Sequence, residues 1–247
     1  ATAIGCFAIA SGSNTIALSR SAKARGDSAV ALGYNTTASG SNATALGRDA
    51  TASGTHSTAV GNYATASGNN ATAIGDDAKA SKYSATALGF STNASGDTAT
   101  AVGKSAKASG DFAIAMGCFA NASSLNSTAI GYRATCSHSH STAIGCYAKA
   151  TAPDQIVLGT SSDTVYIPGN LVVNKNVYLT GSCRNASDDD TELPLYIRDM
   201  RSNTSTPQAA RVFSKDHYLR IRKENNTVSL SDRRLKNVGE VFSGGLD

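Results

Sequence analysis

The residues best suited to chemistry lie near the C-terminus, in the stretch Leu230–Val238, which reads LSDRRLKNV. It holds the hydroxyl of Ser231 and the amine of Lys236 within one short segment. An amine at its ordinary pKa of about 10.4 is protonated at neutral pH, so a lysine can accept a proton only where burial lowers its pKa. In isolation, such a pair is ordinarily an exposed serine and lysine in a basic turn.

Two other groups of polar residues precede this stretch. The acidic run Asp188–Asp190 lacks the glycine-anchored ligand spacing of a calcium loop, so we interpret it as a solvated loop. Tyr196, Tyr218, Arg220 and Arg222 could bind sugar by stacking and hydrogen bonding, but packing in a core or at its rim is the commoner role of such residues. We therefore expect no cofactor and no metal.

The chain that must position these groups repeats every seven residues from Ala1 to about Ser161. Units such as AIASGSN, AVALGYN and TTASGSN recur in register, and the third residue is Ala in 21 of 23 units while the fifth is Gly in 18. The fourth residue is aliphatic in every odd-numbered unit and mostly serine in even-numbered units. The true period is therefore fourteen residues.

This period predicts a β-solenoid rather than a coiled coil. An Ala and a Gly in nearly every unit leave no second large apolar position, and Gly inside a helix costs ~1 kcal/mol. With the period of a strand, residues 1 and 3 of each unit face inward, residues 2 and 4 face outward, and residues 6 and 7 form the corner. Coils stacked at about 4.8 Å would give a rod on the order of 50 Å long.

The outward residues predict one solvated face and one covered face. Even units present several lysines and serines, whereas odd units present an unbroken aliphatic stripe that is too large to leave in water. We expect the same stripe on symmetry-related chains to cover it, in a parallel homo-oligomer. The predicted interface residues are Ile4, Leu18, Leu32, Leu46, Val60, Ile74, Leu88, Val102, Met116, Ile130, Ile144 and Leu158.

The alternating AxAIGxx and AxASGxx units resemble the head domain of trimeric autotransporter adhesins of the Yersinia type, over roughly residues 1–161. The resemblance implies an all-β fold, a left-handed parallel β-roll, and a parallel homotrimer rather than a dimer. It also implies a bacterial surface adhesin, which is one of two functions that the sequence supports.

Aromatic residues at the corners are candidates for contact with glycan or protein, although covering neighbouring chains or coils is their more ordinary role. They are Phe7, Tyr34, Tyr63, Phe112, Phe119, Tyr132 and Tyr147.

Five cysteines, an odd number, form no close-spaced framework. They are Cys6, Cys118, Cys136, Cys146 and Cys183. We expect free thiols, which favours assembly in a reducing cytoplasm over export through a periplasm. Cys136 faces inward while His138 and His140 lie at the corner, so we do not expect these three residues to bind a metal.

After the repeat rod of residues 1–161, short runs of β-branched and aromatic residues alternate with turn residues. We predict a β connector over residues 162–182 and a small β-rich module over residues 183–230, with contacts shared among three chains. The expected strands are Thr164–Ile167, Leu171–Val173, Val177–Leu179, Leu195–Arg198, Arg211–Phe213 and Tyr218–Arg222.

The stretch from Leu230 resembles the start of the intramolecular chaperone and self-cleaving domain of phage tail spikes, endosialidases and related viral fibres. A Ser-Asp-x-x-Leu-Lys signature in that family carries a Ser/Lys dyad that cuts the bond before the serine. The resemblance implies that Ser231 is the nucleophile and Lys236 the general base, with the cut between Leu230 and Ser231. Residues 231–247 cover only the start of that domain, so we expect the site to be incomplete and inactive here.

These features predict a structural attachment fibre of a virus or phage, a trimeric rod on the virion surface that contacts a host cell-surface glycan or protein. A bacterial trimeric autotransporter-type adhesin head on the cell surface is the alternative. The chain is not expected to be an enzyme beyond a single-turnover self-cleavage, since no Asp/Glu pair stands out and a thin roll has no cavity.

Composition agrees with a fibrous protein, because aromatic residues make up 6% of the chain and charged residues 16%. The net charge of +4 is spread along the chain, so neither a nucleic-acid partner nor membrane insertion is expected. The sequence begins within a repeat unit and without methionine, which we attribute to truncation or processing.

Overall fold

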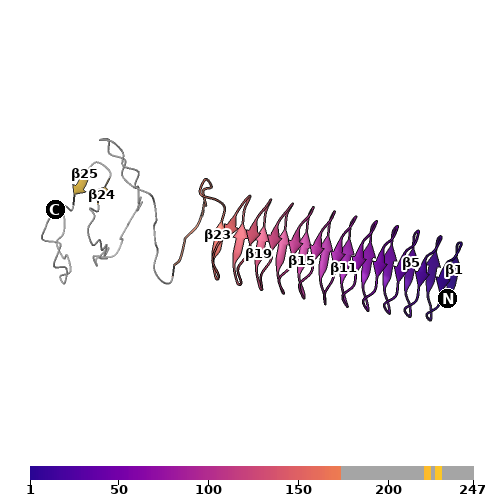
Figure 1. Ribbon diagram of the computed structural model, residues 1–247. Helices are drawn as coiled ribbons and strands as arrows, with labels where there is room; N and C mark the ends of the chain where they lie inside the picture. Colours follow the sequence, from indigo (N-terminus) through magenta and orange to yellow (C-terminus); the bar gives the residue numbers. More distant parts are fainter. Residues whose placement is uncertain (174–219, 224–225, 230–247) are drawn as a thin grey trace. The chain divides into compact units, whose positions relative to one another are not determined.

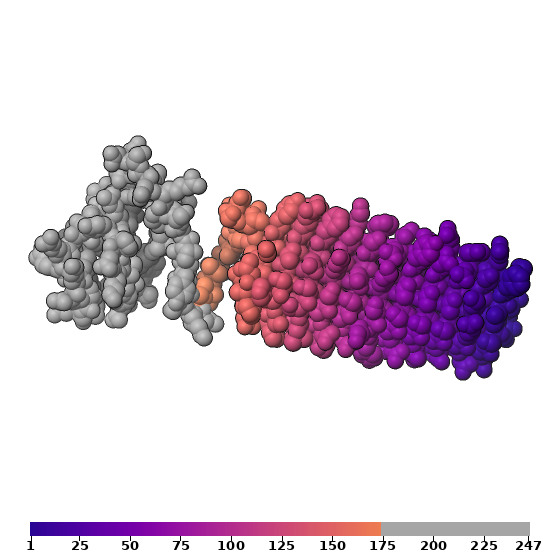
Figure 2. Space-filling view, in the orientation of Figure 1, coloured from indigo at the N-terminus to yellow at the C-terminus, as the bar shows by residue number. Residues whose placement is uncertain are grey.

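A computed structural model describes residues 1–173, 220–223 and 226–229 (Figure 1). The chain divides into two compact units, Ala1–Leu171 and Val172–Asp247. The first unit is a parallel β-solenoid whose coils stack one on another along a rod, and the space-filling view shows them in continuous contact (Figure 2). Among the described residues there is no helix long and apolar enough to cross a membrane.

Two parallel sheets form the solenoid. The 12-stranded sheet contains β1 (Thr2–Ile4), β3 (Ile16–Leu18), β5 (Val30–Leu32), β7 (Thr44–Leu46), β9 (Thr58–Val60), β11 (Thr72–Ile74), β13 (Thr86–Leu88), β15 (Thr100–Val102), β17 (Ile114–Met116), β19 (Thr128–Ile130), β21 (Thr142–Ile144) and β23 (Ile156–Leu158). The 11-stranded sheet contains β2 (Ile9–Ala10), β4 (Lys23–Ala24), β6 (Thr37–Ala38), β8 (Thr51–Ala52), β10 (Thr65–Ala66), β12 (Lys79–Ala80), β14 (Asn93–Ala94), β16 (Lys107–Ala108), β18 (Asn121–Ala122), β20 (Thr135–Cys136) and β22 (Lys149–Ala150).

The register confirms the fourteen-residue coil. Ala73 in β11 pairs with Ala59 in β9 and with Ala87 in β13, so each residue lies beside its equivalents in the coils before and after it. The strands are shorter than the sequence pattern suggests, with three residues in the 12-stranded sheet and two in the 11-stranded sheet. Residues outside the strands consequently make up more than half of each coil.

The core between the two sheets consists almost entirely of alanine. First and third residues of the repeat unit are fully buried from Ala17 to Ala150, and the inward-facing pattern predicted from the sequence is confirmed. The largest fully buried side chains are threonines and a cysteine, namely Thr15, Thr36, Thr92 and Cys136. Leu, Ile and Phe therefore lie outside the core, since the space between the sheets admits only small side chains.

Several first positions of the unit hold a buried hydroxyl that hydrogen bonds to a corner carbonyl. Ser127 Oγ donates to Ser124 O at 2.6 Å, and Ser141 Oγ donates to His138 O at 2.6 Å. Ser57 Oγ is the exception, because it is buried and has no hydrogen-bond partner among the described residues. An unpaired buried hydroxyl costs stability relative to alanine at the same place.

Two corners join the sheets, and each needs special backbone geometry. We call residues 6–7, 20–21 and their equivalents every fourteen residues to 160–161 the first corner, and residues 13–14 to 153–154 the second corner. The seventh residue of every unit from Phe7 to Asp154 has a left-handed backbone, with φ between 49° and 61°. This explains the frequent Asn, Asp and Ser there, since they tolerate that conformation better than most residues.

Glycine at the fifth position serves the two corners differently. Gly61, before the first corner, has φ of +134°, and a Cβ there would overlap the Gly75 carbonyl oxygen of the next coil. Gly68, before the second corner, lacks positive φ, yet its Cβ would overlap the Lys82 carbonyl oxygen. Close stacking of coils, as well as the turn itself, therefore requires glycine.

Side chains at the second corner also link neighbouring coils. Asp27 Oδ1 accepts a hydrogen bond from Ser13 N at 2.8 Å, and Asp111 Oδ1 accepts one from Asp97 N at 2.9 Å. Each bond satisfies a corner N–H that has no place in a sheet. The frequent Asp and Asn at this corner are thus explained by their side-chain oxygens, which accept hydrogen bonds from backbone N–H groups of the preceding coil.

The segment after the last coil differs from the prediction. Residues 164–173 are exposed and form no strand, although Thr164–Ile167 and Leu171–Val173 were expected to be strands. β-branched residues favour a strand only where another strand pairs with them, and these residues have no such partner in the described part of the chain. The expected strand Val177–Leu179 lies outside the described residues.

In the second unit, β24 (Arg220–Lys223) and β25 (Asn226–Ser229) form an antiparallel hairpin. Its register pairs Ile221 with Val228. The hairpin confirms a strand within Tyr218–Arg222, while Leu195–Arg198 and Arg211–Phe213 lie outside the described residues.

Replacing Gly61 with alanine is expected to destabilise the solenoid. The positive φ alone costs about 1–3 kcal/mol for a residue with a Cβ, and the overlap with the next coil adds to it. Thermal unfolding followed by circular dichroism measures the change. Gly169→Ala is the matched control, because a Cβ at Gly169 would meet no atom within 4 Å. Equal unfolding temperatures for the two variants would refute this account of coil stacking.

Replacing Ser57 with alanine is expected to stabilise the solenoid by about 1 kcal/mol, because it removes a buried hydroxyl that has no partner. Ser127→Ala should instead destabilise it, because Ser127 Oγ donates to Ser124 O. Chemical denaturation of the two variants side by side gives the difference. A loss of stability in Ser57→Ala would show that its hydroxyl is paired after all.

Candidate interaction surfaces

A single column of aliphatic side chains runs along the outer face of the 12-stranded sheet. We call the twelve fourth-position residues, Ile4 to Leu158, the aliphatic column. Neighbours in the column are paired in register, as Ile74 is with Val60 and Leu88. Their side chains remain accessible in the single chain, with Ile74 at 38% and Leu88 at 43% exposure.

The aliphatic column is continuous with other apolar side chains of the same sheet. Ile16 and Ile114, at the second position of their units, are 40% and 37% exposed and lie on the same outer face. Contiguous apolar surfaces of this extent mark interaction sites in soluble proteins. The geometry therefore places all twelve predicted interface residues on one surface, and no described residue of the chain covers that surface.

The outer face of the 11-stranded sheet is polar. Thr51 and Thr65 lie side by side on it, and Lys79, the next residue along the face, has its Nζ 2.9 Å from Asp77 Oδ1. Serines such as Ser67 are exposed at its fourth positions. This face needs no covering partner.

At the first corner, cationic side chains lie over aromatic rings of neighbouring coils. The guanidinium carbon of Arg20 is 5.6 Å from the centre of the Tyr34 ring, and that of Arg48 is 5.5 Å from the centre of the Tyr63 ring. Such contacts contribute about 0.5–1 kcal/mol at exposed sites. Sequence reasoning missed these pairs, although a spacing of fourteen or fifteen residues between a basic and an aromatic corner residue would have indicated them.

Arg48 also belongs to a hydrogen-bonded cluster. Asp49 accepts a hydrogen bond from Asn35 Nδ2 at 2.8 Å and from Arg48 Nε at 3.1 Å, while Arg48 Nη2 donates to the Tyr63 hydroxyl at 2.9 Å. The Asn35 amide, followed by the Arg48 guanidinium, holds the pKa of Asp49 below its ordinary value. Hydrogen bonding to Asp49 in turn raises the pKa of Arg48. The cluster is exposed and ties together adjacent coils.

Three aromatic rings contact one another near the end of the rod. Phe119 and Tyr132 meet edge to face with ring centres 6.4 Å apart, and Tyr132 and Tyr147 do so at 5.3 Å. Tyr132, chiefly through hydrogen bonding, raises the pKa of Tyr147 above its ordinary value. These rings cover neighbouring coils, as expected, yet they keep 41%, 40% and 55% of their surface exposed.

The cysteines in the described residues are free thiols, which confirms the prediction for Cys6, Cys118, Cys136 and Cys146. Cys136 Sγ points inward, 3.2 Å from Thr128 O and 3.4 Å from Ser141 Oγ. In the described ranges, no three His, Cys, Asp or Glu side chains converge as metal ligands would. Cys183 lies outside those ranges.

The remaining predicted site residues cannot be placed. Ser231 and Lys236 lie outside the described residues, as do Tyr196, Tyr218 and the acidic run Asp188–Asp190. Of the residues considered for sugar binding, Arg220 and Arg222 belong to β24. The self-cleaving dyad therefore stays a prediction from the sequence.

Comparisons with known proteins bear on the repeat. A family model described as the YadA head domain repeat matches residues 1–18, 20–36, 24–50, 38–64, 66–92, 94–117 and 122–148. Among solved structures, the crystal structure of the collagen-binding domain of the Yersinia adhesin YadA is similar, with 25% sequence identity and a TM-score of 0.48. That similarity covers 65% of this chain and 82% of the other. No curated protein matches the chain.

The matched segments follow one another with few gaps along the described solenoid and cover more than half of the chain. They span the alternating units whose third residues form the alanine core and whose fourth residues form the aliphatic column. By this match, the chain belongs to the YadA head domain repeat family.

Proposed function

We propose that this chain is the head of a trimeric autotransporter-type adhesin, a rod on the bacterial surface that attaches the cell to a partner. The observation that carries the proposal is the aliphatic column, whose side chains are exposed or half-buried in the described part of the chain over the whole length of the 12-stranded sheet. Family membership supports the adhesin role. That the oligomer contains three chains is inferred from the resemblance to trimeric adhesin heads.

Rotational symmetry suits this surface. The column is straight, in register and confined to one sheet, so identical columns on chains packed around a common axis can cover one another along the full rod. Parallel packing also places equivalent coils at the same height. The polar face of the 11-stranded sheet and at least one corner of each chain then remain in solvent.

Such a rod would bind through repetition rather than through one deep site. The alanine core leaves no interior cavity for a substrate, and equivalent corner positions recur at about 4.8 Å along each chain. Weak contacts that repeat on three chains add through effective concentration. We infer attachment, not enzymatic turnover, as the function of the rod.

A charge in the aliphatic column is expected to prevent trimer formation. Ile74→Asp would bury an unpaired carboxylate between chains, whereas Ser67→Asp places the same group on the polar face. Native mass spectrometry of both variants measures the oligomeric state. The proposal requires a trimer for Ser67→Asp and a monomer for Ile74→Asp; a trimer in the second case would reject the column as the interface.

The stretch Leu230–Val238 favours a second candidate function, a viral or phage fibre that releases a chaperone segment by self-cleavage. Lys236 could act as a base only where burial lowers its pKa, so the reaction would require the complete folded domain. The rod itself would serve attachment in both cases. The two candidates differ in whether a bacterial cell or a virus particle carries the rod.

The two candidates differ in the mass of the mature chain. The fibre candidate predicts that the product of the complete gene ends at Leu230, and that Ser231→Ala keeps it uncut. Intact-mass measurement on the trimer distinguishes the outcomes. An uncut product that is anchored in an outer membrane would support the adhesin and reject the fibre.

A further inference from the structure

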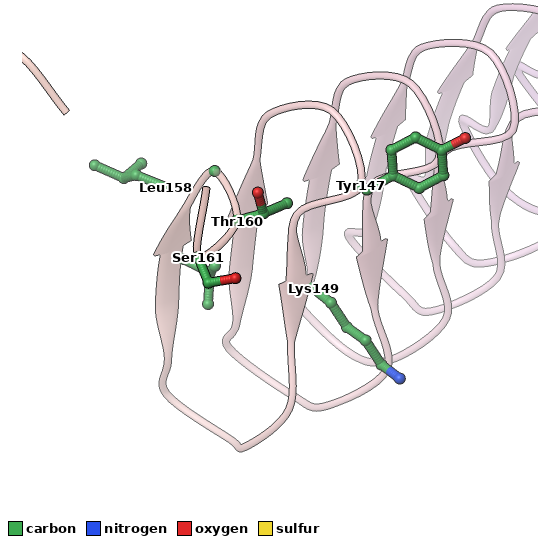
Figure 3. A pocket seen from close by; sticks show the side chains of 7 residues that line it. Tyr147, Lys149, Leu158, Thr160 and Ser161 are labelled. Atoms are coloured by element: carbon green, nitrogen blue, oxygen red, sulfur yellow. The ribbon is translucent and has the colours of Figure 1, made fainter. Parts of the chain in front are cut away.

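An open groove follows the first corner near the end of the rod. It occupies about 450 Å³ and is lined by Phe119, Asn121, Arg133, Thr135, Tyr147 and Lys149. A second hollow of about 320 Å³ shares Tyr147 and Lys149 and continues along residues 157–161 (Figure 3). We call the two together the corner groove.

Three successive coils build the corner groove. Its lining alternates between seventh-position residues of the first corner and second-position residues of β18, β20 and β22. Equivalent residues in adjacent coils lie about 4.8 Å apart, so the groove runs parallel to the rod axis. The first hollow borders the 11-stranded sheet, whereas the aliphatic column lies on the other sheet and meets the groove only at Leu158, in the second hollow. Trimer formation through the column therefore leaves the first hollow accessible.

Aromatic faces and a fixed guanidinium form one wall. The Arg133 guanidinium carbon lies 5.4 Å from the centre of the Phe119 ring and 5.6 Å from that of Tyr132. Stacking holds the planar group in place, and no carboxylate among the described residues pairs with it. A guanidinium held in this way offers its N–H groups to a carboxylate or sulfate in bidentate geometry.

Charge is segregated around this part of the rod. Between residues 91 and 149, every lysine and arginine lies at the first corner or on the outer face of the 11-stranded sheet, and both aspartates lie at the second corner. The cations are Lys104, Lys107, Arg133 and Lys149, and the acids are Asp97 and Asp111. Asp154 also lies at the second corner. The carboxylate of Asp163 lies beside the second hollow, where it accepts hydrogen bonds from Thr160 N and Oγ1.

We propose that the corner groove binds an acidic polysaccharide. Sugar faces would stack on the exposed rings of Phe119 and Tyr147, carboxylates or sulfates would pair with Arg133 and Lys149, and Asn121 and Thr135 are placed to hydrogen bond with hydroxyls. The proposal rests on the proposed function, since the partner of a surface adhesin lies on another surface. Two cations in the lining suit a polymer with one carboxylate per disaccharide, such as hyaluronan, better than a nucleic acid with one phosphate per nucleotide.

The test measures binding of the 247-residue chain to immobilised hyaluronan and chondroitin sulfate, with dextran and oligo(dT) as comparison surfaces. Substitutions are taken from the repeat itself, so that each new residue already occupies an equivalent position. Ser replaces Phe119 and Tyr147 in one double variant (F119S/Y147S), and Asn and Thr replace Arg133 and Lys149 in a second (R133N/K149T). K23T/K79T is the matched control, because it removes two positive charges from the same sheet outside the groove.

We expect binding to at least one acidic polysaccharide and none to dextran. Each groove variant should weaken binding by about tenfold or more, equivalent to ~1.4 kcal/mol, while the control changes it by less than about twofold. An equal loss in K23T/K79T would overturn the proposal in favour of unspecific charge attraction. Equally tight binding to oligo(dT), lost in the same groove variants, would overturn the polysaccharide assignment.

Failure of this inference can be told from failure of the proposed function. The corner groove is built by one chain, so the binding measurement is valid for monomer and trimer alike. A trimer that attaches to cells but ignores both polysaccharides overturns the groove assignment alone. A monomer that binds them overturns the trimeric adhesin and retains the groove.

Discussion

The narrow space between the two sheets is the constraint on which the other features depend. Alanine at the inward positions lets the sheets approach closely, and the largest buried side chains are those of threonine and cysteine. The protein therefore cannot bury Leu, Ile or Phe in its own core, and these residues lie on the outer face or at the corners. A thin core of this kind buries little apolar surface per residue, so covering the aliphatic column by other chains would add stability that one chain lacks. Folding and assembly are then expected to be coupled.

The same closeness governs the coils along the rod axis. Glycine is favoured at the fifth position because, at Gly61 and Gly68 for example, the carbonyl group of the next coil occupies the space of a Cβ. Corner N–H groups donate hydrogen bonds to acceptors in the neighbouring coil, as the Ser13 N–H does to the Asp27 carboxylate. Each coil thus depends on the next for its packing and for its hydrogen bonds, which is the nearest-neighbour behaviour of solenoid proteins.

Much of this architecture could be predicted from the sequence, because a strict period fixes register, inward and outward faces, and the in-line placement of residues such as Ile74 and Leu88. Two features could not. The strand propensity of Thr164–Ile167 does not reveal that the described part of the chain offers this segment no pairing strand, since pairing is a property of the fold and not of the segment. The spacing of Phe119 and Arg133 indicates that they are neighbours in adjacent coils, but the stacked geometry of their contact depends on side-chain directions at a left-handed corner, which a linear pattern does not give. The C-terminal dyad of Ser231 and Lys236 stays a matter of sequence resemblance.

In the proposed rod, assembly and recognition lie on separate surfaces. Substitution in the alanine core would alter the spacing of the sheets, and substitution in the aliphatic column would alter the proposed contacts between chains, so those positions have little freedom. Seventh positions of the first corner carry Phe, Ser, Asn, Asp, Tyr and Arg on the same backbone, with φ within a few degrees from coil to coil. The side chain at the first corner of one coil can therefore be replaced without a change in the alanine core beneath it. The corner groove arises in this way, because Phe119, Arg133 and Tyr147 occupy three successive equivalent positions whose counterparts elsewhere are mostly small and polar.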